Sequence, residues 1–222
     1  MLLALDTSTR TASVALYDGS QVLAETSWTS RDYHTTELAP IIQQALGRVG
    51  IEQANLQALG VAIGPGSFTG LRIGLALAKG MALAKQLPLI GIPTLDILAA
   101  AQPILDLPLL AVLQAGRGRL AVGGYTLTEG AWQANQDLRV MEVEALSHSI
   151  QKPTLVCGEL TEAQRHLLAR KRKNVVLASP AQSLRRAGYL AELAWKRFQS
   201  GQMDNPAALA PIYLHIGEPI PA

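Results

Sequence analysis

The most specific string in the sequence is a glycine-rich turn that leads into a helical pattern. It runs from Gly64 to Gly74 and reads GPGSFTGLRIG. Glycine permits positive φ angles and close approach of the backbone, and Ser67 or Thr69 is placed to cap the following helix. Free amides at a helix start attract anions, so Gly64, Gly66 and Ser67 are candidates for a phosphate cradle. A Walker A loop is excluded because no Gly-Lys-Ser/Thr follows, and a purely structural strand-to-helix turn fits the string equally well.

A second candidate for anion binding lies near the start of the chain. The apolar residues 2–5 are typical of a buried strand, which ends in Asp6, Thr7 and Ser8. Backbone N–H groups in a tight turn form a concavity that binds anions. The arrangement resembles the first phosphate loop of the actin, hexokinase and sugar-kinase class, where an aspartate helps to place the metal and hydroxyls receive phosphate. A plain turn at the end of a strand is the alternative.

Other arrangements that support catalysis are missing from the sequence. The four histidines are scattered, and no two lie three to five residues apart, so there is no helical zinc pair. There is no Gly-x-Ser-x-Gly elbow and no Cys-x-x-Cys. The single cysteine, Cys157, follows an apolar run and is interpreted as a small buried residue. The sequence therefore predicts no catalytic residue and no metal site.

The composition predicts a large core or a surface that a partner covers. Of the 222 residues, 49% are hydrophobic and 16% are charged, against a usual charged share of about 25%. The net charge of +2 does not by itself imply a polyanionic partner. No uncharged apolar run reaches the roughly 18 residues of a membrane helix. We therefore expect a soluble, cytoplasmic protein.

The spacing of apolar residues predicts a duplicated α/β fold. The first half has the order βββαβα, with an extra strand and helix after it. Its predicted strands are 2–5, 12–17, 22–28, 59–63 and 89–92, and its helices are 34–49 and 70–85, with Thr94 as N-cap of the next helix. The second half repeats the plan, with strands 109–113, 120–127, 138–143, 154–156 and 175–177 and helices 159–171 and 182–199. We place two lobes at 1–106 and 107–222, with the last segment free to pack back onto the first lobe.

Two helices of the first half have unusually apolar surfaces. In 34–49 the apolar residues form one stripe, whereas in 70–85 they cover most of the circumference. A helix that is apolar all round must be covered on more than one side. Packing against a second chain explains this pattern, and burial within the monomer is the alternative.

Taken together, these strings resemble the TsaB (YeaZ) family. The resemblance covers the first hundred residues closely and the rest mainly in layout. It is carried by residues 3–9, His34-Thr35 with Leu38, Pro40 and Ile41, the glycine string 64–74, Gly91 with Thr94-Leu95, and Pro211-Ile212-Tyr213-Leu214. It implies the two-lobed actin-like, Hsp70-like and sugar-kinase (ASKHA) fold. It also implies a non-catalytic subunit of the complex that makes threonylcarbamoyladenosine next to the tRNA anticodon.

The resemblance further implies which partners the chain has. It would form a heterodimer with the transferase TsaD and activate it, join the ATPase TsaE, and reach tRNA only through the complex. It would pair with itself when TsaD is missing. In TsaD a His-x-x-x-His pair binds the metal, and the corresponding positions here are Thr94 and Leu98. The implied partner-binding residues are His34, Leu38, Ile41, Ile42, Ala45, Leu71, Gly74, Leu75, Ala78 and Met81.

One departure from the family bears on cofactor binding. Many relatives have an Asp-Ala-Arg string at the end of the first strand of the second lobe, where this chain has Gln114-Ala115-Gly116-Arg117. We therefore expect no cofactor, with weak ATP or ADP binding as the alternative. The alternative function is an ATP-dependent phosphotransferase or ATPase of the ASKHA type that uses Asp6 and the glycine loop.

Overall fold

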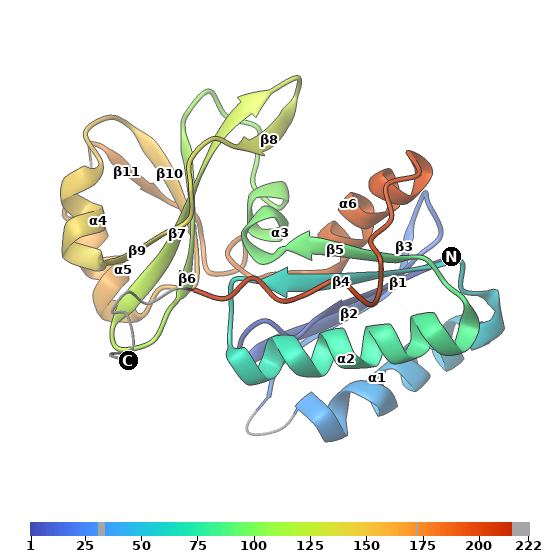
Figure 1. The fold of residues 1–222 in the computed structure, drawn as a ribbon. Coiled ribbons are helices and arrows are strands. Elements are labelled where there is room, and N and C mark those ends of the chain that lie inside the picture. The colour runs from blue at the N-terminus through green and yellow to red at the C-terminus, as the bar shows by residue number, and fades with distance from the viewer. Residues whose placement is uncertain (31–33, 172, 215–222) are drawn as a thin grey trace.

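The computed structural model describes residues 1–30, 34–171 and 173–214, and it contains two β-sheets side by side (Figure 1). The first sheet has the strand order β3-β2-β1-β4-β5. Strands β1, β2 and β3 are antiparallel neighbours, whereas β4 and β5 run parallel to β1. The bounds are β1 Leu2–Asp6, β2 Thr11–Tyr17, β3 Val22–Thr29, β4 Ala58–Gly64 and β5 Leu89–Pro93.

Helices cover both faces of this sheet, so β1 is buried over its whole length. Successive side chains of a strand point to opposite faces. Leu3 and Leu5 therefore pack toward α1 and α2, while Leu2 and Ala4 pack toward α6. Figure 1 shows α1 and α2 side by side on one face and α6 on the other. The helices are α1 His34–Val49, α2 Phe68–Lys85 and α6 Ala187–Gln199, with a 3₁₀ turn at Gln53–Asn55.

The second sheet repeats the plan of the first. Its strand order is β11-β10-β6-β7-β8, with β9 also paired to β7. Strand β6 is parallel to β10 and antiparallel to β7, as β1 is to β4 and β2. The α/β class and the duplicated order of elements are thus confirmed. The elements are β6 Leu109–Gln114, β7 Arg119–Thr128, β8 Ala131–Ala134, β9 Arg139–Glu142, α4 Val143–Ser149, β10 Thr154–Gly158, α5 Glu162–Ala169 and β11 Val175–Leu177.

A short helix, α3 (Thr94–Ala100), connects the two lobes. Ile97 belongs to the core cluster of the first sheet, whereas Leu95 and Leu98 belong to that of the second. Asp96 on the same helix accepts a hydrogen bond from Tyr125 Oη of β7 at 2.7 Å. Side chains that point in different directions from this one short helix therefore connect the two cores.

Several predicted boundaries differ from the structure. Thr94 is the first residue of α3 rather than its N-cap, which is Pro93. The Thr94 hydroxyl instead accepts a hydrogen bond from Gly64 N at 3.1 Å, so it fixes the end of β4. Helices α5 and α6 are shorter than predicted, and α4 and β8 were not predicted. Short elements of four to eight residues are stabilised by tertiary packing, which local propensity does not encode.

The Asp96–Tyr125 contact predicts a pH-dependent difference in stability. Burial raises the pKa of Asp96, although the Tyr125 hydrogen bond lowers it in part. A carboxyl group whose pKa is raised by folding contributes stability below its unfolded pKa and loses that contribution as the pH rises. Asp96→Asn keeps an acceptor for Tyr125 but cannot ionise. The thermal midpoint of Asp96→Asn should therefore rise relative to wild type as the pH increases from acid to neutral.

Thermal unfolding at a series of pH values measures this difference. Asp106→Asn, the same exchange in an exposed loop, is the control. Parallel curves for the wild type and Asp96→Asn would contradict the prediction.

Candidate functional site

The end of β1 and the first two residues of the loop after it are buried, and their polar side chains are bonded within the chain. Asp6 is fully buried and accepts a hydrogen bond from Ser8 N at 2.8 Å. Thr7 Oγ1 donates to Gly70 O at 2.7 Å, and Ser8 Oγ lies 2.9 Å from Thr94 Oγ1. The three residues predicted to bind phosphate here therefore face other parts of the protein.

The glycine-rich turn packs directly on this loop. A Cβ atom at Gly66 would lie 2.2 Å from Ser8 O, and one at Gly70 would lie 2.2 Å from Thr7 O. Ser67 N donates to Ser8 O at 2.6 Å, and the Ser67 side chain caps α2 by accepting from Gly70 N at 3.3 Å. These glycines are needed because two backbone segments touch. These contacts show that the glycine-rich string forms a structural strand-to-helix turn.

An arginine that the sequence did not single out occupies the junction of the two lobes. Arg185, just before α6, is buried, and its three guanidinium nitrogens all have partners. Nε donates to Asp6 Oδ2 at 2.8 Å, and Nη1 donates to Glu159 Oε1 at 2.5 Å. Nη2 donates to Thr9 Oγ1 at 2.6 Å and to Thr11 O at 2.9 Å. One side chain therefore joins the end of β1, the start of β2 and the residue after β10.

The charges at this junction hold Arg185 in its ionised form. Burial alone lowers the pKa of Arg185, but attraction to Asp6 and then Glu159 outweighs burial and raises it. Thr9 Oγ1 also donates to Glu159 Oε1 at 2.6 Å. Two carboxylates therefore share one guanidinium.

A cleft of about 670 Å³ lies outside this cluster, between the lobes. In the two-lobed class that the sequence resembles, such a cleft would hold a metal with nucleotide phosphates. Asp6 points away from the cleft toward Arg185, and the Glu159 carboxylate would face any phosphate. Arg10 also lines the cleft, but the one carboxylate among the described residues of the lining, Glu159, is already paired with Arg185, so the residues present do not fit a metal–phosphate group. The cleft is lined by Thr9, Arg10, Thr11, Gly66, Ser67, Phe68, Gln114, Ala115, Gly116, Glu159, Tyr213 and Leu214.

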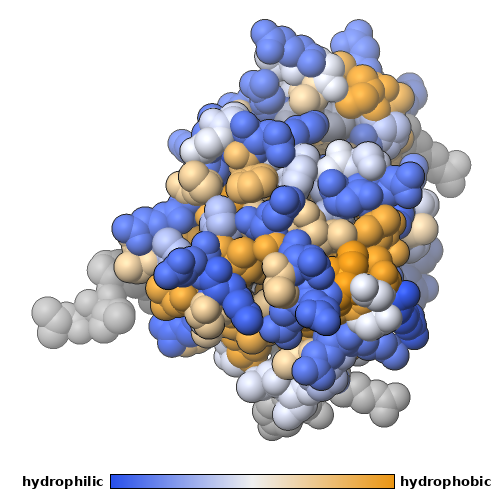
Figure 2. Space-filling view, turned by 90° about the vertical axis from the view of Figure 1, so that its right-hand side faces the viewer, coloured by the Kyte–Doolittle hydropathy of each residue, from blue (hydrophilic) through white to orange (hydrophobic). Residues whose placement is uncertain are grey.

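A second hollow, of about 510 Å³, lies between α1 and α2. Ala39 and Ala76 are exposed there, and Ile73 and Leu77 are half-buried. Farther along α2, Leu83 is 72% exposed. We call the outer surface of these two helices the α1–α2 face, and its groove is lined by Thr35, Leu38, Ala39, Phe68, Thr69, Arg72, Ile73, Ala76 and Leu77. Figure 2 views the other end of the helices, where α1 and α2 finish, and hydrophobic patches bordered by hydrophilic residues lie there.

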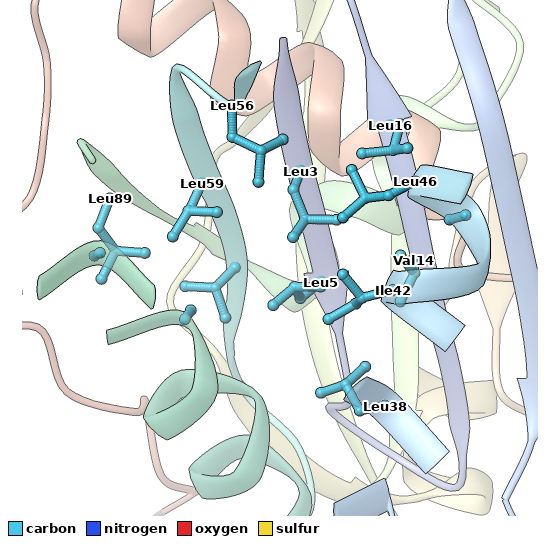
Figure 3. Close-up of a cluster of buried hydrophobic side chains, with 14 of the residues drawn as sticks. Leu3, Leu5, Val14, Leu16, Leu38, Ile42, Leu46, Leu56, Leu59 and Leu89 are labelled. Carbon is cyan, nitrogen blue, oxygen red and sulfur yellow. The ribbon is translucent and has the colours of Figure 1, made fainter. Parts of the chain in front are cut away.

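Most of the residues predicted to bind a partner are buried within the chain's own core. On α1 the buried ones are Leu38, Ile42 and Ala45, and Figure 3 shows Leu38 and Ile42 pointing toward Leu5 of the sheet. Of these three, only Leu38 reaches the lining of the groove. Because the sheet covers most of their surface, all three offer a partner little contact area. The same holds on α2 for Leu71, Gly74, Leu75 and Ala78.

Three of the predicted partner-binding residues are not among these buried ones. Ile41 and Met81 are half-buried. The side chain of His34, the first residue of α1, lies outside the described part of the structure. A partner on the α1–α2 face would therefore meet the exposed neighbours of the predicted residues.

An aromatic cluster lies where the cleft and the groove meet. The Arg72 guanidinium carbon lies 3.6 Å from the centre of the Phe68 ring, and Arg72 Nε donates to Tyr213 Oη at 2.9 Å. The rings of Phe68 and Tyr213 are 5.2 Å apart. Ile212 N donates to Ile63 O at 2.7 Å, which fixes the C-terminal segment at the end of β4. The segment thereby shapes the edge of the groove, a contact that spacing in the sequence could not reveal.

Two absences in the described part of the chain limit what the site can be. In residues 1–30, 34–171 and 173–214, no three His, Cys, Asp or Glu side chains are grouped to hold a metal ion. Within the same ranges, no helix is both long and apolar enough to cross a membrane.

The fold places the chain in the two-lobed class of sugar kinases and actin-like proteins. A ROK hexokinase from Thermus thermophilus matches 90% of this chain and 99% of its own, with a TM-score of 0.51 at 11% identity. At that identity the likeness shows the fold alone.

Closer relatives narrow the class. A family model described as TsaD, tRNA N6-adenosine threonylcarbamoyltransferase, matches residues 21–197. The Escherichia coli (strain K12) protein named tRNA threonylcarbamoyladenosine biosynthesis protein TsaB is 34% identical over 154 residues, which are 68% of this chain and 66% of that protein. YeaZ from Pseudomonas aeruginosa has a TM-score of 0.79 at 26% identity and covers 96% of this chain and 99% of its own. The chain therefore belongs to the TsaB (YeaZ) family, which is related to TsaD.

Two glycines of α2 should respond in opposite ways to the same substitution. Gly70→Ala places a methyl group against Thr7 O and should destabilise the protein by about 1–3 kcal/mol. Gly80 has open space around its Cβ position, so Gly80→Ala should stabilise the helix by up to about 1 kcal/mol. Urea unfolding measures both. Equal effects at the two positions would contradict the close packing of the turn on the β1–β2 loop.

Proposed function

We propose that this chain is the non-catalytic subunit of the complex that makes threonylcarbamoyladenosine in tRNA, and that it binds and activates the transferase TsaD. Membership of the TsaB family supports a part in this pathway, because relatives carry that name. The observation that carries the pairing is the α1–α2 face. There, α2 exposes apolar residues on one side while its other side is fully packed.

The shape of the α1–α2 face supports a helical contact. Ala76, Gly80 and Ala84 are exposed and lie four residues apart, so they form one line along α2. Small residues in a line permit a neighbouring helix to approach closely, and the half-buried Ile73 and Leu77 beside them supply apolar surface. A contiguous apolar patch of this kind marks an interaction site.

The absence of transferase chemistry is the second part of the proposal. The positions that carry the metal-binding histidines in TsaD are occupied here by Thr94 and Leu98. Both residues have structural roles. The Thr94 hydroxyl accepts a hydrogen bond from Gly64 N, and Leu98 is fully buried where α3 packs against the second sheet. Activation would then act through the shape of the TsaD subunit, because differential contact with one of two states shifts their populations.

The further partners follow from the same role. TsaE would join the pair, tRNA would reach it only through the complex, and a second copy of the chain would occupy the α1–α2 face when TsaD is missing. A location in the bacterial cytoplasm follows from the same proposed role.

A charge on the α1–α2 face should disrupt the pairing with TsaD. Ala76→Glu buries a carboxylate in the proposed contact, and we expect the dissociation constant to rise at least tenfold, or about 1.4 kcal/mol. Isothermal titration of TsaD with the variant measures this change.

The matched control is Ala131→Glu, the same exchange at an exposed position of β8 in the second lobe. It should leave the affinity for TsaD unchanged. A folded Ala76→Glu protein that binds TsaD as tightly as the wild type would exclude this face as the contact.

A further inference from the structure

We propose that Arg185 is a built-in ligand of the inter-lobe junction: its guanidinium takes the place of a bound cation and holds the two lobes in one orientation without nucleotide or metal. The inference rests on the junction alone and is independent of the proposed pairing with TsaD.

The first step of the argument is that the junction is chemically complete. The guanidinium donates to Asp6, Glu159, Thr9 and Thr11, with distances from 2.5 to 2.9 Å. The other oxygen of Asp6 accepts from Ser8 N. Buried carboxylates need a cation or hydrogen-bond donors, and here a side chain of the same protein supplies both.

The second step is that the ligand spans the two lobes. Asp6 ends β1 of the first sheet, whereas Glu159 follows β10 of the second. Two carboxylates without the guanidinium would repel each other and push the lobes apart. The arginine is therefore placed to set the distance between the lobes.

The third step is that the segment holding Arg185 is itself anchored. The next residue, Arg186, pairs with Glu25 of β3, and Gly188 N donates to Glu25 Oε1 at 2.7 Å. Helix α6 then packs on the first sheet through Leu190 and Ala194. Anchoring lowers the entropic cost of holding a long side chain in one geometry.

The fourth step concerns what the junction rejects. Glu159 is the part of the cluster that reaches the cleft, with its side chain 23% exposed. Arg10 also lines the cleft, so the fit depends on the metal rather than on the phosphate. The magnesium ion of a nucleotide needs a carboxylate ligand, and the one carboxylate among the described residues that line this cleft is already bonded to Arg185. The junction should therefore not accept a magnesium–nucleotide.

The wild-type protein gives the first test. Titration with magnesium–ATP, and with magnesium chloride alone, should give no binding heat and no rise in the thermal midpoint at millimolar concentrations. Magnesium-dependent binding of ATP would overturn the proposal, because the junction would then hold the metal–phosphate that Arg185 is said to replace.

Chemical rescue gives the second test. Arg185→Ala should lower the thermal midpoint by about 10 °C, and millimolar guanidinium chloride should recover part of this loss, whereas sodium chloride at the same ionic strength should not. The matched control is Arg48→Ala, the same exchange at an exposed position of α1 away from the junction. It should shift the midpoint by a few degrees at most and show no rescue. An Arg185→Ala protein that melts like the wild type, or that guanidinium does not stabilise, would contradict the assignment.

Distances between the lobes give a third test that needs no change at Arg185. Spin labels on cysteines introduced at the exposed Gln44 and Gln133 report the separation of the first and second lobes. The native Cys157 is fully buried and should stay unlabelled. In protein diluted with unlabelled chains, we expect one narrow distance distribution that magnesium–ATP does not alter. A broad distribution, or one that shifts with the nucleotide, would overturn the proposal.

Discussion

The placement of one charged side chain constrains the rest of this structure. Arg185 is shared by Asp6, which ends β1 of the first sheet, and Glu159, which follows β10 of the second. Removing one partner of a buried ion cluster leaves an uncompensated charge and costs about 3–5 kcal/mol, although the intact cluster itself adds little stability. The ion cluster therefore matters for the geometry of the protein more than for its stability. It fixes how the two lobes meet, and so it fixes the cleft and the C-terminal segment that crosses toward the groove.

Helix α2 shows how one element serves two surfaces. Its inner side is glycine-rich because Thr7 of the β1–β2 loop lies directly against Gly70 and Gly74. Its outer side keeps Ala76 and Gly80 exposed, with open space at Gly80. The glycine-rich turn, which the sequence suggested as a phosphate cradle, therefore holds the helix rigidly against the sheet. The rigid helix can then present its outer side to a partner without further ordering cost.

The sequence predicted the order of elements along the chain and the two central helices because long periodic patterns depend on local residues alone. It failed where the answer depends on distant contacts. Leu38 and Ala78 have the residue type of an interface, yet the sheet covers both. Arg185 and Glu159 gave no local signal, since they are 26 residues apart and become neighbours only when the second sheet forms. Thr94 looked like a helix cap, but its hydroxyl binds the end of β4 instead.

The central claim is that the chain contributes to tRNA modification as an obligatory partner without catalysing it. A reconstituted assay tests this most directly: purified TsaD, TsaE and threonylcarbamoyl-AMP are combined with unmodified tRNA, with and without this chain. Modification that requires the chain, together with no modification by the chain alone, is the result that the account predicts. Equal modification in its absence, or transfer by the chain alone, would contradict it.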